Sequence, residues 1–262
     1  MSRIWISFLT IVIYALAQYL PVFIIKLTSF QIKSPTQLLH VAIYIQVILF
    51  IIAAIIIILL QKVIKNPTKL ESDYKEPKRY LVQYALLGFI VVMIYQMFAG
   101  LINTWIFGEL KASPNTERLM DIARQAPIFI ILISIVGPIL EEYVFRKVIF
   151  GEILDRLKGN IVMRFLIASV VSSLLFALAH NDITFIIVYF GMGMIFSLAY
   201  VLTKRIAVSI MIHMMQNGFV VIMQVCFGDV LKHLQTQANA IFHLFFNQRI
   251  PSKHILLLGW DI

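Results

Sequence analysis

Two adjacent glutamates stand in an otherwise apolar part of the sequence, in the segment EEYVFR that runs from Glu141 to Arg146. Neighbouring residues of an α-helix differ by about 100° around the helix axis, so the two carboxylates point in different directions. Arg146 follows Glu142 by four residues and lies on nearly the same face. We therefore expect an ion pair between Glu142 and Arg146, which leaves Glu141 available as a general base.

Two further pairs of residues have helical i, i+4 spacing later in the chain. Phe176 and His180 place a ring and an imidazole on one face, and His213 and Asn217 do the same for an imidazole and a carboxamide. A carboxylate, two imidazoles and an amide can together activate water and stabilise a tetrahedral oxyanion. The candidate catalytic residues are Glu141, Glu142, His180, His213 and Asn217, with Arg146 and Phe176 shaping the site.

Each pair also has a purely structural interpretation. Glu142 and Arg146 can lock a helix as a buried ion pair, His213 and Asn217 can hydrogen-bond neighbouring membrane helices, and His180 alone can be a solvated residue at a helix end. An ionisable side chain in the middle of a bilayer costs about 2.5–3.5 kcal/mol. Apolar contacts would hold the helices without that cost, so a structural role explains all three pairs together less well.

Other kinds of catalytic site can be checked against the sequence. The sequence has no HExxH zinc-protease motif. Serines at positions 169–173 precede His180 on one predicted helix, but no GxSxG segment surrounds them, and we interpret them as packing residues. Glu141, His180 and His213 can form a three-ligand zinc site with water as the fourth ligand, so zinc stays an alternative to a site without a cofactor.

The overall composition is that of an integral membrane protein. Hydrophobic residues make up 61% of the 262 residues and charged residues only 13%, whereas soluble domains have roughly 45–50% and about 25%. The formal net charge of +9 does not predict a nucleic-acid partner, because the basic residues lie in short segments between apolar runs. The single cysteine, Cys226, excludes an intrachain disulfide and a multi-cysteine metal cluster.

Seven apolar runs are long enough to cross the roughly 30 Å core of a bilayer as helices. They predict an all-α, polytopic transmembrane bundle with three parts: N-terminal helices and loops in residues 1–126, a catalytic core in 127–227, and a tail in 228–262 that suits the membrane interface. Gly191 and Gly193 predict a close helix contact. The runs are Ile4–Ile25, Leu38–Leu60, Tyr80–Phe107, Pro127–Phe150, Ile161–His180, Ile183–Leu202 and Ile206–Phe227.

The distribution of basic residues predicts the orientation in the membrane. The N-terminus shares one side with the loops between runs 2 and 3, 4 and 5, and 6 and 7, and these segments hold most of the Lys and Arg. The positive-inside rule places this side in the cytoplasm. Seven spans then put the tail outside. The opposite loops hold fewer basic residues, namely Lys26, Lys33, Lys111, Arg118 and Arg124.

The depths of two candidate residues disagree when the helices are drawn straight. Glu141 then lies roughly 20 Å from the outer end of its run, whereas His180 lies almost at the outer end of its own. Either a bend at Gly137-Pro138 or a change in the run boundaries can bring them together. We expect the boundaries of these two runs to differ from the prediction by two turns or more.

At these motifs the chain resembles the CAAX protease and bacteriocin-processing family, also called the CPBP or Abi family. The family motifs EExxxR, FxxxH and HxxxN all occur here, in order and on successive apolar segments. Their joint occurrence between Pro127 and Phe227 is far more specific than any one of them.

The resemblance implies an intramembrane endopeptidase with a glutamate-dependent mechanism. Glu141 and His180 would activate water, and His213 and Asn217 would form the oxyanion site. The second glutamate and the arginine of the EExxxR motif would shape that site.

The resemblance also implies the partners and the location. The substrate would be a membrane-associated peptide or protein, such as the precursor or leader of an autoinducing peptide in bacterial quorum sensing, and the protein would lie in the bacterial plasma membrane. A non-catalytic scaffold or bacteriocin-immunity protein with the same fold is the main alternative. A transporter is a third, because buried carboxylates and histidines also form proton relays.

Overall fold

The computed structural model describes residues 1–28, 34–108 and 112–246, and within these ranges it contains helices and no strand, which confirms the predicted all-α fold. Lys33, Lys111 and residues 247–262 of the predicted tail lie outside the described residues. The elements are α1 (Arg3–Thr28), α2 (Pro35–Lys62), α3 (Lys69–Ser72), η1 (Lys78–Tyr80), α4 (Leu81–Phe107), α5 (Pro114–Gln125), α6 (Phe129–Ile131), η2 (Leu132–Val136), α7 (Gly137–Glu141), η3 (Glu142–Phe150), α8 (Gly151–Arg156), α9 (Ile161–Ala179), η4 (Ile183–Phe185), α10 (Ile186–Thr203) and α11 (Ile206–Phe246).

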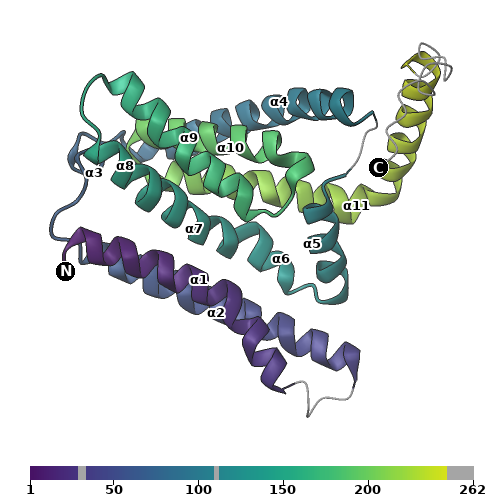
Figure 1. The fold of residues 1–262 in the computed structure, drawn as a ribbon, viewed down its shortest axis with the longest axis horizontal. Helices are drawn as coiled ribbons and strands as arrows, with labels where there is room; N and C mark the ends of the chain where they lie inside the picture. Colours follow the sequence, from purple (N-terminus) through teal and green to yellow (C-terminus); the bar gives the residue numbers. More distant parts are fainter. Residues whose placement is uncertain (29–33, 109–111, 247–262) are drawn as a thin grey trace, which may run out of the picture.

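Six helices in the described part of the chain are long and apolar enough to cross a membrane: Arg3–Leu27, Pro35–Lys62, Lys78–Phe107, Ile161–Ala179, Ile183–Thr203 and Ile206–Phe242. They correspond to six of the seven predicted runs. Figure 1 shows α1 and α2 as an antiparallel hairpin along one side of the bundle, and α4, α9, α10 and α11 on the other side. The fourth predicted run, which contains the two glutamates, lies between these groups as α6 to α8.

The fourth run is one helix with two π-helical segments. Its π-helical parts η2 and η3 lie on either side of α7. The amide of Gly137 donates to the carbonyl of Leu132, five residues earlier, and Pro138 has no amide hydrogen to donate. A Cβ on Gly137 would lie 3.0 Å from that carbonyl oxygen. The glycine therefore permits the wide turn that precedes Glu141.

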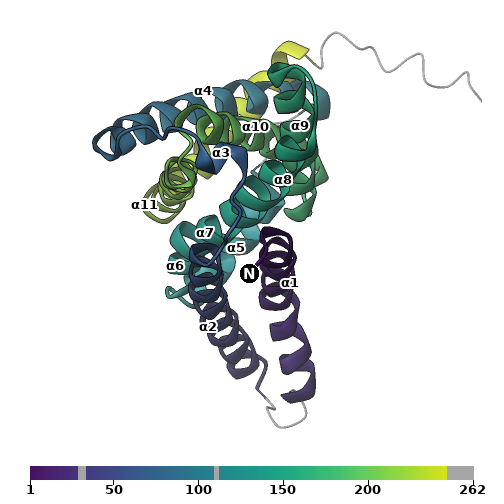
Figure 2. The same ribbon diagram turned by 90° about the vertical axis from the view of Figure 1, so that its left-hand side faces the viewer.

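This segmented helix contributes to each of three hydrophobic clusters along its length. Phe129 and Leu140 pack with α1, α2 and α5, Val144 and Phe145 with α4, α9, α10 and α11, and Phe150 with α9 and α10. Burial of apolar side chains on several sides explains why the helix lies in the centre of the bundle. The end-on view in Figure 2 shows the α1–α2 hairpin projecting from this centre.

One end of the bundle is fastened by ion pairs near the N-terminus. The Arg3 side chain lies 3.0 Å from Glu152 Oε1 and 2.8 Å from Asp155 Oδ2, and the Lys69 amide donates to Asp155 at 3.0 Å. Burial raises the pKa of Asp155, but the hydrogen bonds from Lys69 and Arg3 outweigh it and hold the pKa below its usual value. These contacts join the start of α1 to α3 and α8.

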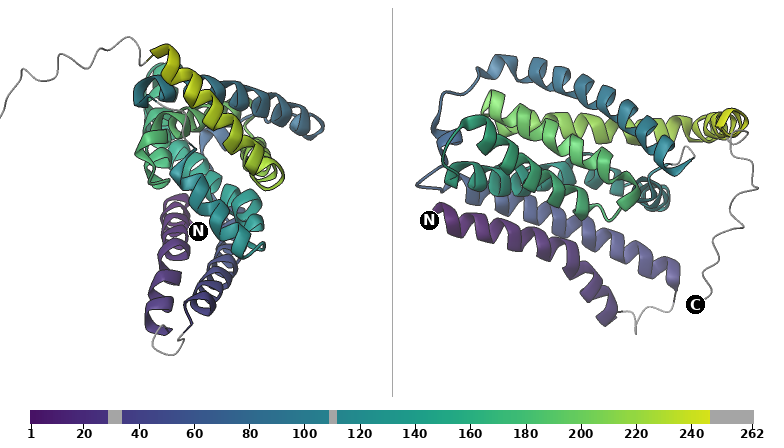
Figure 3. Two further views of the ribbon diagram at one scale, coloured as in Figure 1. Left: turned by 90° about the vertical axis from the view of Figure 1, so that its right-hand side faces the viewer. Right: turned by 45° about the horizontal axis from the view of Figure 1, so that its top comes forward.

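The last helix extends further than the sequence analysis predicts. α11 runs to Phe246, whereas the seventh apolar run ends at Phe227. The sequence after Phe227 contains many strong helix formers and no proline before Pro251, so nothing in it stops the helix. Figure 3 shows the final part of α11 turning away from the bundle.

The predicted close helix contact at Gly191 and Gly193 is confirmed. A Cβ on Gly193 would lie 2.8 Å from Cβ and Oγ of Ser173 on α9, and one on Gly191 would overlap the ring of Tyr95 on α4. The two glycines let α10 approach both neighbouring helices.

A methyl group at position 193 should destabilise this packing. We expect Gly193→Ala to lower the free energy of unfolding by about 1–3 kcal/mol, the usual cost of overpacking, as a fall in thermal midpoint measured in detergent micelles. The matched control is Gly218→Ala on α11, where a Cβ meets no atom within 4 Å, and there we expect no loss. Equal midpoints for the two variants would contradict the packing role of Gly193.

Candidate active site

The predicted ion pair between Glu142 and Arg146 forms in the interior of the protein. Arg146 Nε lies 3.3 Å from Glu142 Oε2, and both side chains are fully buried. The Arg146 guanidinium lies over the rings of Phe176 and Phe196, with its central carbon 4.1 and 5.0 Å from the ring centroids. Aromatic faces attract a cation, so these rings help to accommodate a charge that is shielded from water.

Glu142 also holds the first ring nitrogen of His213. His213 Nδ1 lies 3.0 Å from Glu142 Oε1, and the Ser209 hydroxyl donates to Glu142 Oε2 at 2.6 Å. Both carboxylate oxygens therefore have partners on α11 or in the ion pair. Ser209 is missing from the sequence prediction, although it precedes His213 by four residues and shares its helix face.

Glu141 has the freer carboxylate of the two. Its side chain is 22% exposed, and its Oε2 lies 3.7 Å from His213 Nε2. The His213 ring thus lies between the two glutamates, with one nitrogen toward each. The different environments predicted for Glu141 and Glu142 are confirmed, but His213 is the histidine that pairs with Glu141.

His180 is oriented by its own helix and by an aromatic ring. Its Nδ1 lies 2.8 Å from the carbonyl oxygen of Phe176. A carbonyl can only accept, so Nδ1 carries the proton and Nε2 of the neutral ring keeps a free lone pair. The His180 ring is 4.6 Å from the Phe176 ring and stacks on Tyr189 at 4.0 Å, which confirms the predicted Phe176–His180 contact.

Residues that the sequence analysis did not select support Tyr189. The Ser113 hydroxyl, at the start of α5, lies 2.9 Å from the Tyr189 hydroxyl and donates to Asp182 Oδ2 at 2.7 Å. Asp182 follows α9 and also accepts from the Thr184 hydroxyl at 2.8 Å. Only the fold brings these segments together, because Ser113 and Asp182 are far apart in the sequence.

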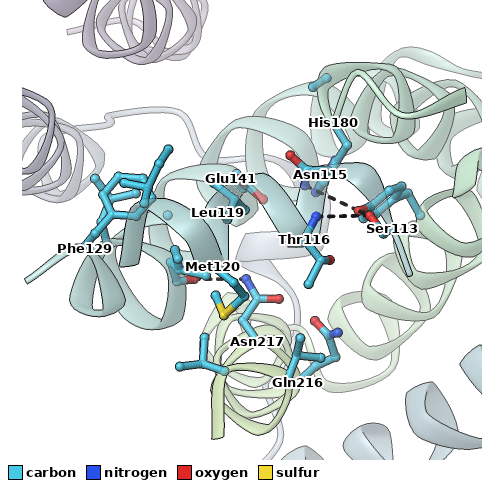
Figure 4. Close-up of a pocket in the computed structure, with 18 of the residues that line it drawn as sticks. Ser113, Asn115, Thr116, Leu119, Met120, Phe129, Glu141, His180, Gln216 and Asn217 are labelled. Carbon is cyan, nitrogen blue, oxygen red and sulfur yellow. Dashed lines mark hydrogen bonds between the residues drawn. The ribbon is translucent and has the colours of Figure 1, made fainter. Parts of the chain in front are cut away.

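A cavity of about 610 Å³ connects the candidate residues. Glu141, His180, His213 and Asn217 all line it, and Figure 4 shows Glu141 and His180 with Asn217 of α11 around one space. One amide hydrogen of Asn217 bonds to the carbonyl of Ile133 at 3.0 Å, which leaves the other for a ligand. The three sequence motifs therefore meet at a single cavity inside the bundle.

Glu141 and His180 line the same cavity despite the different depths that straight helices predict for them. α9 spans Ile161–Ala179, in agreement with its predicted run, so the expected boundary shift of two turns is wrong for this helix. The segmented helix ends at Arg156 rather than at Phe150. The cavity extends to both Glu141 and His180, so the two side chains line one space.

Comparison with known proteins identifies the family. A family model described as "Type II CAAX prenyl endopeptidase Rce1-like" matches residues 123–219. The chain is 58% identical over 245 residues to the "Membrane-embedded CAAX protease MroQ" of Staphylococcus aureus strain USA300, covering 94% of this chain and 99% of MroQ. The chain belongs to the CAAX protease family. This CAAX protease is a multi-pass membrane endopeptidase, a hydrolase.

A more distant relative agrees with this assignment. The CAAX protease is 33% identical over 240 residues to the "Putative membrane peptidase YdiL" of Bacillus subtilis strain 168, covering 91% of this chain and 95% of YdiL. No solved structure matches the chain. The region matched by the family model includes all five candidate catalytic residues.

The zinc alternative requires Glu141, His180 and His213 to converge on one point. His180 Nε2 has a free lone pair that could bind a metal, but His213 Nε2 is directed at Glu141 Oε2, 3.7 Å away. Among the described residues of this CAAX protease, no group of three or more His, Cys, Asp or Glu is arranged to hold a metal ion. These residues do not fit a zinc site in this arrangement.

Removal of Arg146 should leave a buried negative charge without its ion pair. We expect Arg146→Met to lower the free energy of unfolding by about 3–5 kcal/mol, measured by thermal unfolding in detergent. Adding Glu142→Gln to this variant should recover part of the loss, because no charge then remains buried.

Arg156→Met is the matched control, since the Arg156 side chain is 58% exposed and pairs with Glu152 at 3.1 Å. Glu152 is buried but keeps Arg3 at 3.0 Å when Arg156 is removed, so the pair with the exposed arginine should contribute only about 0–1 kcal/mol. Equal losses for Arg146→Met and Arg156→Met would contradict the importance of the buried pair.

Proposed function

We propose that the CAAX protease hydrolyses a peptide bond in its intramembrane cavity, with Glu141 and His180 as the residues that activate water. The observation that carries the proposal is the meeting of Glu141, His180, His213 and Asn217 at one cavity. A carboxylate and an imidazole Nε2 that both have free lone pairs are suitable proton acceptors for a water between them.

The proposed reaction begins when the water oxygen attacks the carbonyl carbon and Glu141 accepts a water proton. The carbonyl oxygen of the tetrahedral intermediate becomes negative, and the unbonded amide hydrogen of Asn217 donates to it. His213 adds a second donor from Nε2 when both of its nitrogens carry protons. The proton on Glu141 then passes to the amide nitrogen, the carbon–nitrogen bond breaks, and a carboxylic acid and an amine leave.

Glu142 and Arg146 act in this proposal through His213. Glu142 accepts from His213 Nδ1 at 3.0 Å, and this fixes the ring with Nε2 toward Glu141. The buried ion pair with Arg146 keeps Glu142 ionised for this task.

We further propose that the substrate is the precursor or leader of an autoinducing peptide, whose processing or export controls quorum sensing. The support is the family resemblance carried by the three motifs, and the 58% identity to a membrane-embedded CAAX protease is consistent with a substrate at the membrane. A cavity of about 610 Å³ also has room for a short peptide segment.

The proposed location is the bacterial plasma membrane, with the N-terminus in the cytoplasm. The N-terminus, α3 and α8 lie at the same end of the bundle, as Figure 1 shows, and most basic residues of the connecting segments belong to this end. The positive-inside rule places such an end in the cytoplasm.

Purified protein in liposomes should cleave quenched fluorescent peptides made from an autoinducing-peptide precursor. We expect Glu141→Gln and His180→Ala each to lower kcat by about a hundredfold or more, because each removes a proton acceptor.

Glu117→Gln on α5, an exposed carboxylate outside the cavity, is the matched control and should keep full activity. Thermal midpoints close to wild type show that the variants are folded. Full activity of both cavity variants would refute the assigned roles, and a wild type that cleaves no peptide would favour the scaffold alternative. Unchanged activity with a chelator is expected, because the site residues do not fit a metal.

In cells, Glu141 should control the level of mature autoinducing peptide. We expect a strain that carries Glu141→Gln in place of the wild-type gene to secrete at least tenfold less mature peptide, by mass spectrometry of the medium, as the rate loss predicts. The Glu117→Gln strain should match wild type. Unchanged secretion, with the purified variant inactive, would show that the physiological substrate is a different peptide or protein.

A further inference from the structure

Carboxamide side chains give the cavity a polar wall beside the candidate catalytic residues. Gln46, Gln96, Gln216 and Asn217 all line it, from three different helices. A carboxamide offers both a donor and an acceptor but carries no charge. Such a wall is unusual between membrane helices, where polar groups are normally bonded to each other or to the backbone.

Gln216 differs from the other members of this wall. The side-chain nitrogen of Gln46 bonds to the Ala17 carbonyl at 3.1 Å, and that of Gln96 bonds to the sulfur of Met192. Asn217 bonds to the carbonyl of Ile133. Gln216 is 95% buried, and its Oε1 has no hydrogen-bond partner.

A buried polar group without a partner is costly, at about 1–3 kcal/mol. Buried side-chain oxygens and nitrogens are normally satisfied, so an exception points to a ligand or to a strained group. Figure 4 shows the carboxamides of Gln216 and Asn217 projecting from α11 into the space that Glu141 and His180 also line. The Gln216 side chain therefore lines the reaction cavity, with its unbonded Oε1 shielded within it.

The chemistry of a carboxamide matches that of a peptide group. An extended peptide within a bilayer must find partners for each backbone N–H and C=O that has left water. Gln216 follows His213 by three residues on α11 and is adjacent to Asn217, so its group lies beside the proposed oxyanion site.

We propose that Gln216 binds the backbone of the substrate, by pairing its carboxamide with one peptide group next to the scissile bond. The inference rests on the proposed peptidase function and adds a mode of recognition to it. It predicts that the enzyme selects an extended backbone at this position and tolerates changes in the side chain there.

The test combines a side-chain variant with a backbone-modified probe. The probe is the fluorescent precursor peptide of the cleavage assay, together with analogues in which each backbone N–H near the cleavage site is methylated in turn. Gln216→Met keeps the size of the side chain and removes its hydrogen bonds. We expect KM to rise about tenfold with kcat nearly unchanged, as loss of a bond to bound substrate predicts.

One N-methyl analogue should bind the wild type about tenfold more weakly and should bind Gln216→Met no more weakly than the unmodified peptide does. Gln125→Met is the matched control, because Gln125 is exposed on α5 outside the cavity. It should leave both KM and the N-methyl scan unchanged.

Binding without cleavage separates this inference from the proposed function. Fluorescence anisotropy of the labelled probe is measured with Glu141→Gln protein, with and without Gln216→Met. Equal affinities, or an N-methyl scan that is the same in both proteins, would overturn the role of Gln216 while cleavage by wild type still stood. If the wild type does not cleave the probe but Gln216→Met still lowers the affinity for it, the result would support the role of Gln216 and reject the proposed chemistry.

Discussion

The buried ion pair between Glu142 and Arg146 is the interaction on which the site depends. Two charges in a membrane protein interior are stable only when each has a close partner, and here the carboxylate gains three: the arginine, Ser209 and His213. These contacts join the central helix to α11, and the aromatic rings of α9 and α10 cover the guanidinium. The geometry of His213 therefore depends on four helices at once.

The central helix carries both the buried ion pair and a glutamate that lines the cavity. Glu141 ends α7 and Glu142 begins η3, and because adjacent helix residues point in different directions, Glu142 lies in the core while Glu141 reaches the cavity. π-helical turns are often retained at functional sites because they re-aim side chains at a cost in regular hydrogen bonding. Gly137 also favours the wide turn before Glu141, because a Cβ there would lie only 3.0 Å from the Leu132 carbonyl oxygen.

The α1–α2 hairpin and α5 complete the cavity from the other side. Tyr14 of α1, Phe50 of α2 and Met120 of α5 line the same space as the residues of the three motifs. The N-terminal helices therefore contribute to the cavity, although the family model matches only residues 123–219.

The sequence by itself determined the membrane setting, the all-α fold and the three motifs, because apolar run length and i, i+4 spacing act locally along a helix. It also determined the Glu142–Arg146 and Phe176–His180 contacts, which lie within single helices. Only the tertiary structure decided that His213 lies between both glutamates, that Ser209 supports Glu142, and that Gln216 is buried without a partner. Those facts depend on which helices pack together and how the π-helical turns rotate them, and no local pattern in the sequence records either.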